Sequence, residues 1–200
     1  MQTQENPFSH KARSARTRKD LIDAAALLFA RTAYDRITTP EIVANAGVSR
    51  GALYHHFADK REIFAAVVER ESAEVAAQIQ AATTKSESAL DAFVRGADAY
   101  FAAIASAPGR ARILLIEGPA VLGAEAMQEI DRKTGQGTLR EGLVHAIEQG
   151  EMRPLPIDAT ADLLSAAFDR AALAIASGEQ AHEYRDAIRS LLEGLLNRPR

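Results

Sequence analysis

Apolar residues recur at intervals of three or four along almost the whole chain, and this spacing restricts the possible folds more than any other feature. One stripe near the start comprises Leu21, Ala25, Leu28 and Phe29, and a later one comprises Ile63, Phe64, Val67, Val68 and Val75. Residues on one face of an α-helix are spaced in this way, whereas a half-buried strand alternates at every second residue. No convincing alternating stretch or internal repeat is present. The sequence therefore predicts an all-α protein.

Capping and turn residues divide the pattern into separate helices. Thr39 is predicted as an N-cap with Pro40 at the first helical position, and Gly47 ends this helix. Asp59 and Glu62 resemble a capping box that opens a long helix through about residue 82. Further helices, bounded by glycine and proline, are predicted over residues 90–107, 132–149, 159–177 and 181–196.

The net charge of -3 is unevenly distributed along the chain. Residues 1–61 hold ten Lys and Arg against six Asp and Glu, a balance of +4, and the remainder carries -7. A basic end on an acidic body predicts that only one end contacts a polyanion, although a basic leader would produce the same count. Because the charge changes sign near the start of the long helix, we divide the chain into domains at 1–58 and 59–200.

The composition excludes several classes of protein. The chain has no cysteine, which rules out disulfides, thiolate metal sites and cysteine nucleophiles and is typical of a reducing compartment. The first twenty residues lack the apolar core of a secretory signal, and no apolar stretch approaches the ~18 residues that a membrane span needs. We therefore expect a cytoplasmic protein that does not contact a membrane.

The stretch AGVSRGALYHHF, from Ala46 to Phe57, predicts a helix-turn-helix whose second helix enters the major groove of DNA. Gly51 and Ala52 lie in the first turn of that helix, which comes closest to the base edges, and a large side chain there would hold the helix off the DNA. Leu53 and Phe57 are expected to anchor the helix to the core. The small and the large residues therefore have complementary roles.

The polar residues of the same stretch are the candidate DNA contacts. Arg50 is the candidate for a bidentate contact with guanine, which discriminates between bases by about 1–3 kcal/mol. Tyr54 and His56 can donate hydrogen bonds to phosphates, and a core position is the alternative for Tyr54. Ser49 caps the helix and is included among the DNA-binding candidates. Adjacent histidines point about 100° apart on a helix and have no third ligand nearby, so we predict no metal and no cofactor.

The segment TTPEIVANAGVSRGALYHHFADKREIF, residues 38–64, resembles the DNA-binding domain of the tetracycline-repressor (TetR/AcrR) family of transcriptional regulators. The matching positions are Thr38, Ile42, Ala46, Gly47, Val48, Ser49, Gly51, Tyr54, Phe57 and Lys60. The resemblance implies a homodimer of about nine helices, with an N-terminal three-helix helix-turn-helix domain and a C-terminal helical domain for effector binding and dimerisation.

The resemblance also implies roles for individual residues. Contacts with phosphates are implied for Thr39, Tyr54, His56 and Lys60, and approach to the bases for Arg50, Gly51 and Ala52. Two positions depart from the family pattern. Ala33 stands where many members have the glycine that ends the first helix, and Pro40 stands where some members carry a base-reading side chain. Arg50 would therefore carry more of the sequence specificity.

By the same resemblance, a small hydrophobic or amphipathic effector of unknown identity would bind among the middle helices. The apolar and aromatic candidates for its pocket are Phe93, Tyr100, Phe101, Ile104, Ile113, Ile116, Met127, Leu143, Ile147 and Phe168. Polar groups in an apolar setting mark a site better than apolar ones do. The polar candidates are Glu117, which closes an apolar run that Gly118 and Pro119 interrupt, and His145. A surface or satisfied core position is the alternative for each.

The last two predicted helices carry an alanine-rich face (Ala166, Ala167, Ala171, Ala174) and a leucine-rich face. These faces predict an isologous four-helix dimer seam, with packing inside the subunit as the alternative. Two recognition helices about 34–36 Å apart would then enter successive major grooves of a palindromic operator. We predict a repressor that a small-molecule effector releases from this operator.

Three questions stay open at this point. The protein could be a DNA-binding regulator without small-molecule control. It could also be a helical enzyme that uses Glu117 and His145 as acid and base, although no nucleophile motif or phosphate-binding glycine loop supports this. The basic stretch Lys11–Lys19 is either a disordered arm that touches DNA or a solubilising leader.

Overall fold

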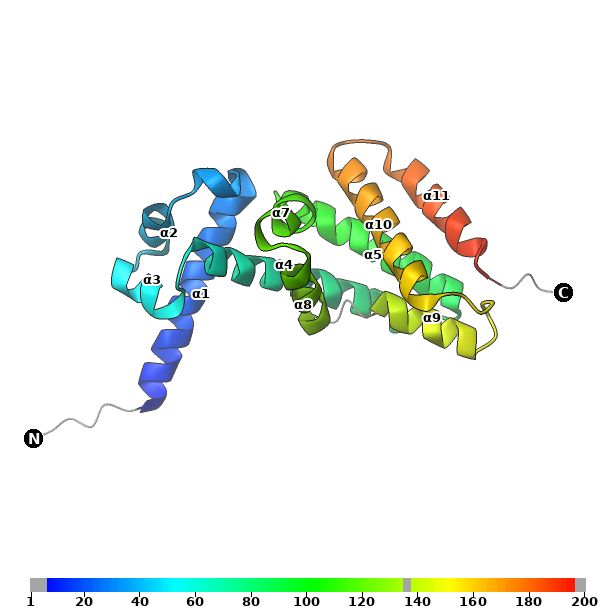
Figure 1. Cartoon of the computed structure of the whole chain (residues 1–200), viewed down its shortest axis with the longest axis horizontal. Helices are drawn as coiled ribbons and strands as arrows, with labels where there is room; N and C mark the ends of the chain where they lie inside the picture. Colours follow the sequence, from blue (N-terminus) through cyan, green and yellow to red (C-terminus); the bar gives the residue numbers. More distant parts are fainter. Residues whose placement is uncertain (1–6, 135–137, 197–200) are drawn as a thin grey trace, which may run out of the picture.

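The computed structural model describes residues 7–134 and 138–196, and helices form almost all of these ranges (Figure 1). An isolated antiparallel bridge between Met152 and Leu196 is the only extended pairing among the described residues. The prediction of an all-α protein is confirmed. No single described helix is long and apolar enough to span a membrane, and one bent pair of helices, 89–106 with 110–122 at 109°, passes that test by length and composition only.

The head of the molecule consists of three helices and one 3-10 turn. They are α1 (Pro7–Arg31), η1 (Tyr34–Arg36), α2 (Thr39–Ala46) and α3 (Arg50–His56). The long helix α4 (Lys60–Thr83) starts beside α1 in the head and runs into the rest of the molecule, which we call the body (Figure 1).

Local hydrogen bonds define the helix starts in the head. Thr38, not Thr39 as the sequence predicts, is the N-cap of α2. The carboxylate of Glu41 accepts hydrogen bonds from the backbone N and the Oγ1 of Thr38, both at 2.7 Å. This reciprocal pairing moves the helix start one residue earlier than the Thr39-Pro40 dipeptide suggests. Asp59 caps α4 as expected, because its carboxylate accepts the backbone N–H of Glu62 at 2.8 Å.

Helix α1 is longer than the sequence predicts. It begins at Pro7, so the stretch Lys11–Lys19 is helical and the expectation of a disordered arm is wrong. The C-terminal half of α1 is held by buried residues such as Leu21, Ala25 and Phe29. Once that half is fixed by packing, each further turn adds hydrogen bonds without a new nucleation cost, so the helix extends through the basic segment.

The body contains the remaining helices. They are α5 (Ala89–Ser106), α6 (Arg110–Arg112), the π-helical turn η2 (Ile113–Glu117), α7 (Gly118–Leu122), α8 (Ala124–Thr134), α9 (Thr138–Glu148), α10 (Ile157–Ala176) and α11 (Ala181–Glu193). One hydrophobic cluster runs from α1 through α4 and α5 to α11 without interruption. In Figure 1 the antiparallel pair α10 and α11 lies at the end of the body far from the head.

The middle of the chain differs from the predicted pattern in two places. Gly118 and Pro119 do not interrupt the apolar run, because α6, η2 and α7 follow one another directly. Proline lacks an N–H and its ring clashes with the carbonyl four residues earlier, and the wider π-helical turn before Pro119 accommodates both. Helix α8 starts at Ala124, eight residues before the helix predicted over 132–149, of which residues 135–137 lie outside the described ranges.

Candidate nucleic-acid interface and ligand cavity

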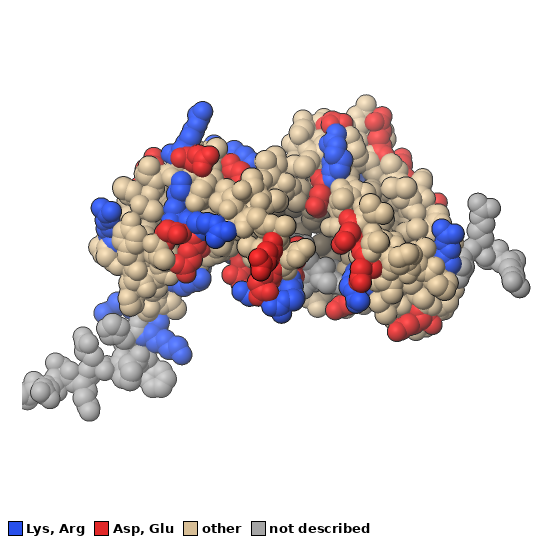
Figure 2. Space-filling view, viewed as in Figure 1, with Lys and Arg blue, Asp and Glu red and all other residues tan. Residues whose placement is uncertain are grey.

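Helix α3 is fastened to the head by one side and open to solvent on the other. Leu53 and Phe57 are buried as predicted, whereas Arg50, Gly51 and Tyr54 are exposed. Ser49 caps the helix by accepting the backbone N–H of Ala52 at 3.1 Å. In Figure 2 the visible face of the head shows many Lys and Arg side chains, and acidic side chains are more frequent over the body. The first turn of α3 is therefore presented outward from a basic end of the molecule.

Gly51 has no structural reason inside the protein to be a glycine. Its φ is not positive, and a Cβ added there would meet only the Oγ of Ser49, at 3.9 Å. Glycine within a helix costs about 1 kcal/mol relative to alanine. A residue that weakens its own helix and leaves open space in front of it is expected where another molecule must approach the backbone closely.

Replacing Gly51 with alanine is expected to raise the free energy of unfolding by about 0.5 kcal/mol, because alanine favours the helix and meets no clash. The same change is expected to weaken binding to duplex DNA, since the added methyl group would meet the base edges when α3 enters the major groove. Thermal melting and DNA-binding titrations measure the two effects. A variant that is both less stable and unchanged in DNA affinity would contradict this account of Gly51.

Arg50, Tyr54 and Thr39 form one polar face across α2 and α3, in which Arg50 and Tyr54 are exposed and Thr39 is half-buried. The guanidinium carbon of Arg50 lies 5.5 Å from the ring centre of Tyr54. Hydrogen bonds from Arg50 and, secondly, from Thr39 hold the pKa of the Tyr54 hydroxyl below its ordinary value. Tyr54 is 45% exposed, so the core alternative for this residue is wrong. The three polar side chains therefore lie next to one another on one surface of the head.

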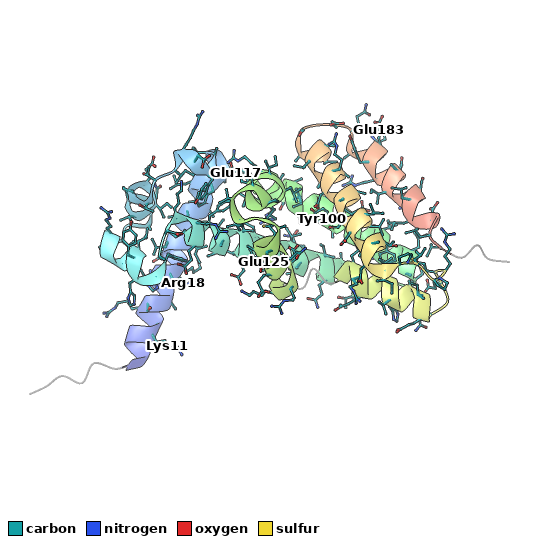
Figure 3. The ribbon with its side chains drawn as sticks, viewed as in Figure 1. Lys11, Arg18, Tyr100, Glu117, Glu125 and Glu183 are labelled. Carbon is teal, nitrogen blue, oxygen red and sulfur yellow. The ribbon has the colours of Figure 1, made fainter. Side chains whose placement is uncertain are left out.

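His56 and Arg18 lie at the other end of α3. The guanidinium carbon of Arg18, from α1, is 5.1 Å from the ring centre of Phe57. Burial, then the charges of His55 and Arg18, lower the pKa of His56, which keeps its imidazole mainly neutral at pH 7. A neutral imidazole still donates one N–H, as a phosphate contact requires. Figure 3 shows Arg18 on α1 at the level of α3 and Lys11 further toward the N-terminus.

Lys60 has an internal role that the sequence does not reveal. Its ammonium donates to the carbonyl oxygens of Tyr34 and Ile37, both at 2.9 Å, and lies 4.0 Å from the ring centre of Tyr34. These contacts close the η1 turn between α1 and α2. The implied phosphate contact therefore competes with two hydrogen bonds already made within the head.

A cavity of about 440 Å³ lies between α4, α5, α9 and α10. Four of the residues proposed from the sequence line it: Phe93 and Tyr100 from α5, His145 from α9 and Phe168 from α10. The volume falls in the range of small-molecule sites. The described lining is completed by Ile79, Thr83, Ala92, Gly96, Ala97, Leu139, Glu141, Gly142, Ser165 and Asp169.

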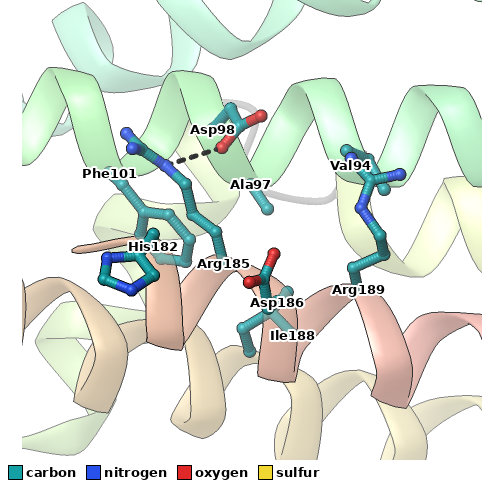
Figure 4. A pocket seen from close by; sticks show the side chains of 9 residues that line it. All are labelled: Val94, Ala97, Asp98, Phe101, His182, Arg185, Asp186, Ile188 and Arg189. Atoms are coloured by element: carbon teal, nitrogen blue, oxygen red, sulfur yellow. Dashed lines mark ion pairs between the residues drawn. The ribbon is translucent and has the colours of Figure 1, made fainter. Parts of the chain in front are cut away.

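The other proposed pocket residues do not line this cavity. Ile104, Ile113 and Leu143 are buried in the core, Met127 and Ile147 pack against it, and Ile116 is exposed. Phe101 lines a smaller cavity of about 160 Å³ between α5 and α11, across which Arg185 and Asp98 pair at 2.9 Å (Figure 4). Helical spacing identifies which side of a helix is covered but not whether the neighbour is a side chain or a cavity.

Glu117 lies at the junction of head and body instead of in the cavity. Its carboxylate accepts the backbone N–H of Tyr34 at 3.3 Å and lies 3.5 Å from Nε of Arg112. Arg112 in turn donates to the carbonyl oxygens of Phe29 and Thr32 at the end of α1. Figure 3 shows Glu117 near α1, apart from Tyr100. Glu117 and His145 are therefore not assembled as an acid–base pair.

The sequence interpretation missed Asp169, which lines the cavity and is hydrogen-bonded to another lining residue, Tyr100. The Tyr100 hydroxyl donates to Oδ1 of Asp169 at 2.6 Å. Burial raises the pKa of Asp169 even though this hydrogen bond lowers it. Burial and the charge of Asp169 also raise the pKa of Asp131, on α8, to about 6. The signal that could have identified this site is the charge of Asp169 directly after Phe168 on the apolar side of α10.

The raised pKa of Asp131 has a consequence for stability. Because its folded-state pKa lies above the ordinary 3.8, the native protein binds more protons than the unfolded chain between about pH 4 and pH 6, and stability falls as the pH rises through this window. Replacing Asp131 with asparagine removes this loss. After allowance for solvent screening, the variant is expected to be more stable by about 1 kcal/mol at pH 7.5.

Denaturant unfolding from pH 4 to pH 7.5 checks this prediction. The advantage of Asp131→Asn over the parent protein should shrink as the pH is lowered and disappear near pH 4. Asp162→Asn, on the exposed side of α10, is the control and should show no such trend. An advantage that is constant across the pH range would contradict the burial of a charged Asp131.

A helix-turn-helix head joined to a larger helical body is the architecture of a class of protein, the helical DNA-binding regulators. Two family models match the chain. The model for "Bacterial regulatory proteins, tetR family" matches residues 21–67, and "Tetracyclin repressor-like, C-terminal domain" matches residues 90–198. The chain therefore belongs to the TetR family of transcriptional regulators, as its resemblance in residues 38–64 predicts.

Individual relatives agree with this assignment. The HTH-type transcriptional repressor BepR of Brucella suis is 42% identical over 60 residues, which are 30% of this chain and 29% of BepR. The A-factor receptor protein of Streptomyces griseus is 37% identical over 68 residues, 34% of this chain and 25% of that protein. The chain thus matches less than a third of the length of these two curated relatives.

Solved structures extend the similarity to the whole chain. A TetR-family transcriptional regulator from Pectobacterium atrosepticum is 31% identical, with a TM-score of 0.72 over 94% of this chain and 98% of that one. FadR from Bacillus subtilis, solved in complex with stearoyl-CoA, has a TM-score of 0.75 over 87% of this chain and 96% of FadR. At 18% identity, FadR shows that the fold is shared and nothing further.

Proposed function

We propose that the protein is a homodimeric repressor that binds a palindromic operator through α3 of each subunit and is released when a small molecule occupies the cavity. The observation that carries this proposal is the outward face of α3, where exposed Arg50 and Tyr54 flank a glycine that the fold does not require. A helix anchored on one side and open in its first turn suits insertion into the major groove.

The exposed side of α10 and α11 supports a dimer. Leu163 on α10 is 73% exposed and Leu191 on α11 is 55% exposed, although large apolar side chains are normally covered. Ala171 and Ala174, which the sequence places in the seam, are buried inside the subunit, so the proposed seam uses the opposite face of α10. An isologous pairing of the two helices with their symmetry mates would cover both leucines.

Helix α4 connects the cavity with the head and suits the transmission of ligand binding. Helix α4 lines the cavity with Ile79 and Thr83 and begins with Lys60, which is bonded to the head. A ligand changes operator affinity only to the extent that it prefers one arrangement of the head over another. The stearoyl-CoA bound by FadR, which shares this fold, supports the proposal that the cavity receives an effector.

The operator proposal is tested by selecting bound sites from random duplexes with the full chain, which should yield an inverted repeat. Arg50→Ala is then expected to reduce the preference for the selected site over random DNA by about 1–3 kcal/mol. Arg18→Ala, which removes an exposed cation of α1 beside α3, is the matched comparison. This variant should weaken binding to both duplexes equally. It should also reduce the slope of log affinity against log salt concentration by about one.

Two results would contradict the proposal. One is a monomer that binds all duplexes equally, because a palindromic operator requires two recognition helices. The other is an equal effect of Arg50→Ala and Arg18→Ala on selected and random DNA, because base reading and phosphate contact would then not be separated. A regulator without small-molecule control would select an operator normally but show no ligand-dependent change in affinity.

A further inference from the structure

The cavity between α4, α5, α9 and α10 combines an apolar wall with negative charge. Two carboxylates line it, Asp169 from α10 and Glu141 from α9, and no Lys or Arg is among its described lining residues. The neighbouring cations in the sequence are paired elsewhere. Arg140 bonds Asp158 at 2.8 Å, and Arg170 lies 3.8 Å from Glu179. Among the described lining residues, no Lys or Arg therefore balances the negative charge of Asp169 and Glu141.

Asp169 is the carboxylate most affected by its surroundings. The Tyr100 hydroxyl is a neutral donor, and no Lys or Arg among the described residues forms an ion pair with Asp169. Partial burial of a carboxylate is unfavourable unless a positive charge accompanies it. A ligand can supply that charge.

The aromatic residues of the lining favour the same kind of ligand. Phe93, Tyr100 and Phe168 all border the cavity, and the Phe168 ring is packed edge-to-face on Phe101 with 6.4 Å between ring centres. The faces of aromatic rings attract cations and also accommodate apolar groups. His145 is the remaining titratable group of the described lining, and both it and Glu141 are exposed.

We propose that this cavity binds an amphipathic cation, an organic amine or quaternary ammonium whose charge lies against Asp169 and whose apolar part lies among Phe93, Tyr100 and Phe168. The inference deepens the effector control proposed above and rests on it for its regulatory consequence. An acyl-CoA such as the stearoyl-CoA bound by FadR is instead negatively charged, and the described lining of this cavity offers it two carboxylates and no Lys or Arg.

The proposal is tested by isothermal titration of the full chain, without DNA, with three ligands that share a ten-carbon tail: decyltrimethylammonium, decanol and decanoate, each below its micellar concentration. Decyltrimethylammonium should bind at least about tenfold more tightly than decanoate, with decanol between them. Equal affinities would show that only the apolar wall recognises ligands. Tighter binding of decanoate would overturn the proposal.

Asp169→Asn tests whether Asp169 recognises the positive charge of the ligand. Asparagine keeps the shape of the side chain and can still accept a hydrogen bond from the Tyr100 hydroxyl. The variant should bind decyltrimethylammonium about tenfold more weakly and decanol unchanged. Asp162→Asn, on the same helix outside the cavity, makes the same change of net charge and should alter neither affinity. Equal losses in the two variants would assign the effect to overall charge and overturn the site.

A separate measurement distinguishes failure of this inference from failure of the proposed function. The selected operator duplex is titrated with protein in the presence of decyltrimethylammonium or stearoyl-CoA. If stearoyl-CoA but not decyltrimethylammonium releases the protein from the operator, the proposal of a cationic ligand is overturned and effector control is retained. Asp169-dependent cation binding without any change in operator affinity would leave the site intact and contradict effector control.

Discussion

Replacing Gly109 with alanine is expected to lower the free energy of unfolding by about 2–4 kcal/mol. Gly109 precedes α6 with φ of 75°, a conformation that L side chains rarely adopt. A Cβ at this position would lie 2.4 Å from the carbonyl oxygen and 2.6 Å from the Cα of Ala30 in α1. Since both atoms belong to the backbone of a helix, they cannot rotate away, and the two helices must separate.

Gly123→Ala is the matched control for this prediction. Gly123 has a similar φ of 81°, but a Cβ there would meet nothing within 4 Å. Gly123→Ala should therefore lower the free energy of unfolding only by the backbone strain, about 1 kcal/mol. Denaturant unfolding measures the loss of unfolding free energy in both variants, and the difference between the two losses is the contribution of the contact with α1. Equal losses would show that α1 and α6 are not in close contact in solution.

Gly109→Ala should also affect the relation between head and body. The helix that approaches Gly109 is α1, which carries the head, so relief of the clash moves α1 relative to α6. Operator affinity measured on the folded variant should change even though Gly109 is far from the candidate DNA contacts in α3. Gly123→Ala should leave operator affinity unchanged.

Replacing Arg110 with methionine is expected to lower the free energy of unfolding by about 3–5 kcal/mol, because it removes one partner of a buried ion pair. Arg110 is 4% exposed. Its Nε donates to Oε2 of Glu71 at 2.8 Å and its Nη1 donates to the carbonyl oxygen of Ala103 at 2.9 Å. The substitution would leave the buried Glu71 carboxylate with only Arg70, which bonds its other oxygen at 2.8 Å.

Two measurements test the origin of this loss. Adding Glu71→Leu to Arg110→Met should recover a large part of the stability, because well-packed apolar residues replace buried ion pairs at little cost. Burial alone would raise the pKa of Glu71, but hydrogen bonds from Arg70 and Arg110 outweigh it and lower the pKa. The stabilisation from this pair is therefore present above the ordinary pKa of 4.5 and is lost as the pH falls below it, so the deficit of Arg110→Met should shrink in acid.

The same ion pair belongs to a chain of contacts from the head to the cavity wall. Asp23 of α1 accepts a hydrogen bond from Arg70 at 2.7 Å, Arg70 and Arg110 share Glu71, and Arg110 bonds Ala103 near the end of α5. Helix α5 also carries Phe93 and Tyr100 into the cavity. A displacement of α5 by a ligand would therefore act on contacts that end in α1, and Arg110→Met should weaken any effect of ligand on operator affinity.

Much of the fold and of the candidate DNA interface was predictable because it depends on neighbours in the sequence. Helix type follows from apolar spacing, and caps such as Ser49 and Asp59 act on residues three positions away. The exposure of Arg50, Gly51 and Tyr54 follows once Leu53 and Phe57 are assigned to the core. The longer α1 and the earlier α2 start were missed because packing and a reciprocal Thr38–Glu41 bond decided them.

The sequence by itself determined that the chain is helical, that a helix-turn-helix lies near its start and that α3 presents small residues outward. Only the tertiary structure decided that Glu117 joins the head, that Lys60 closes the turn after α1, and that Asp169 gives the cavity its charge. Their partners are distant along the chain: 83 residues separate Tyr34 from Glu117, and 69 separate Tyr100 from Asp169. Helical periodicity shows which side of a helix is covered, but the partner that covers it is set by how the helices pack.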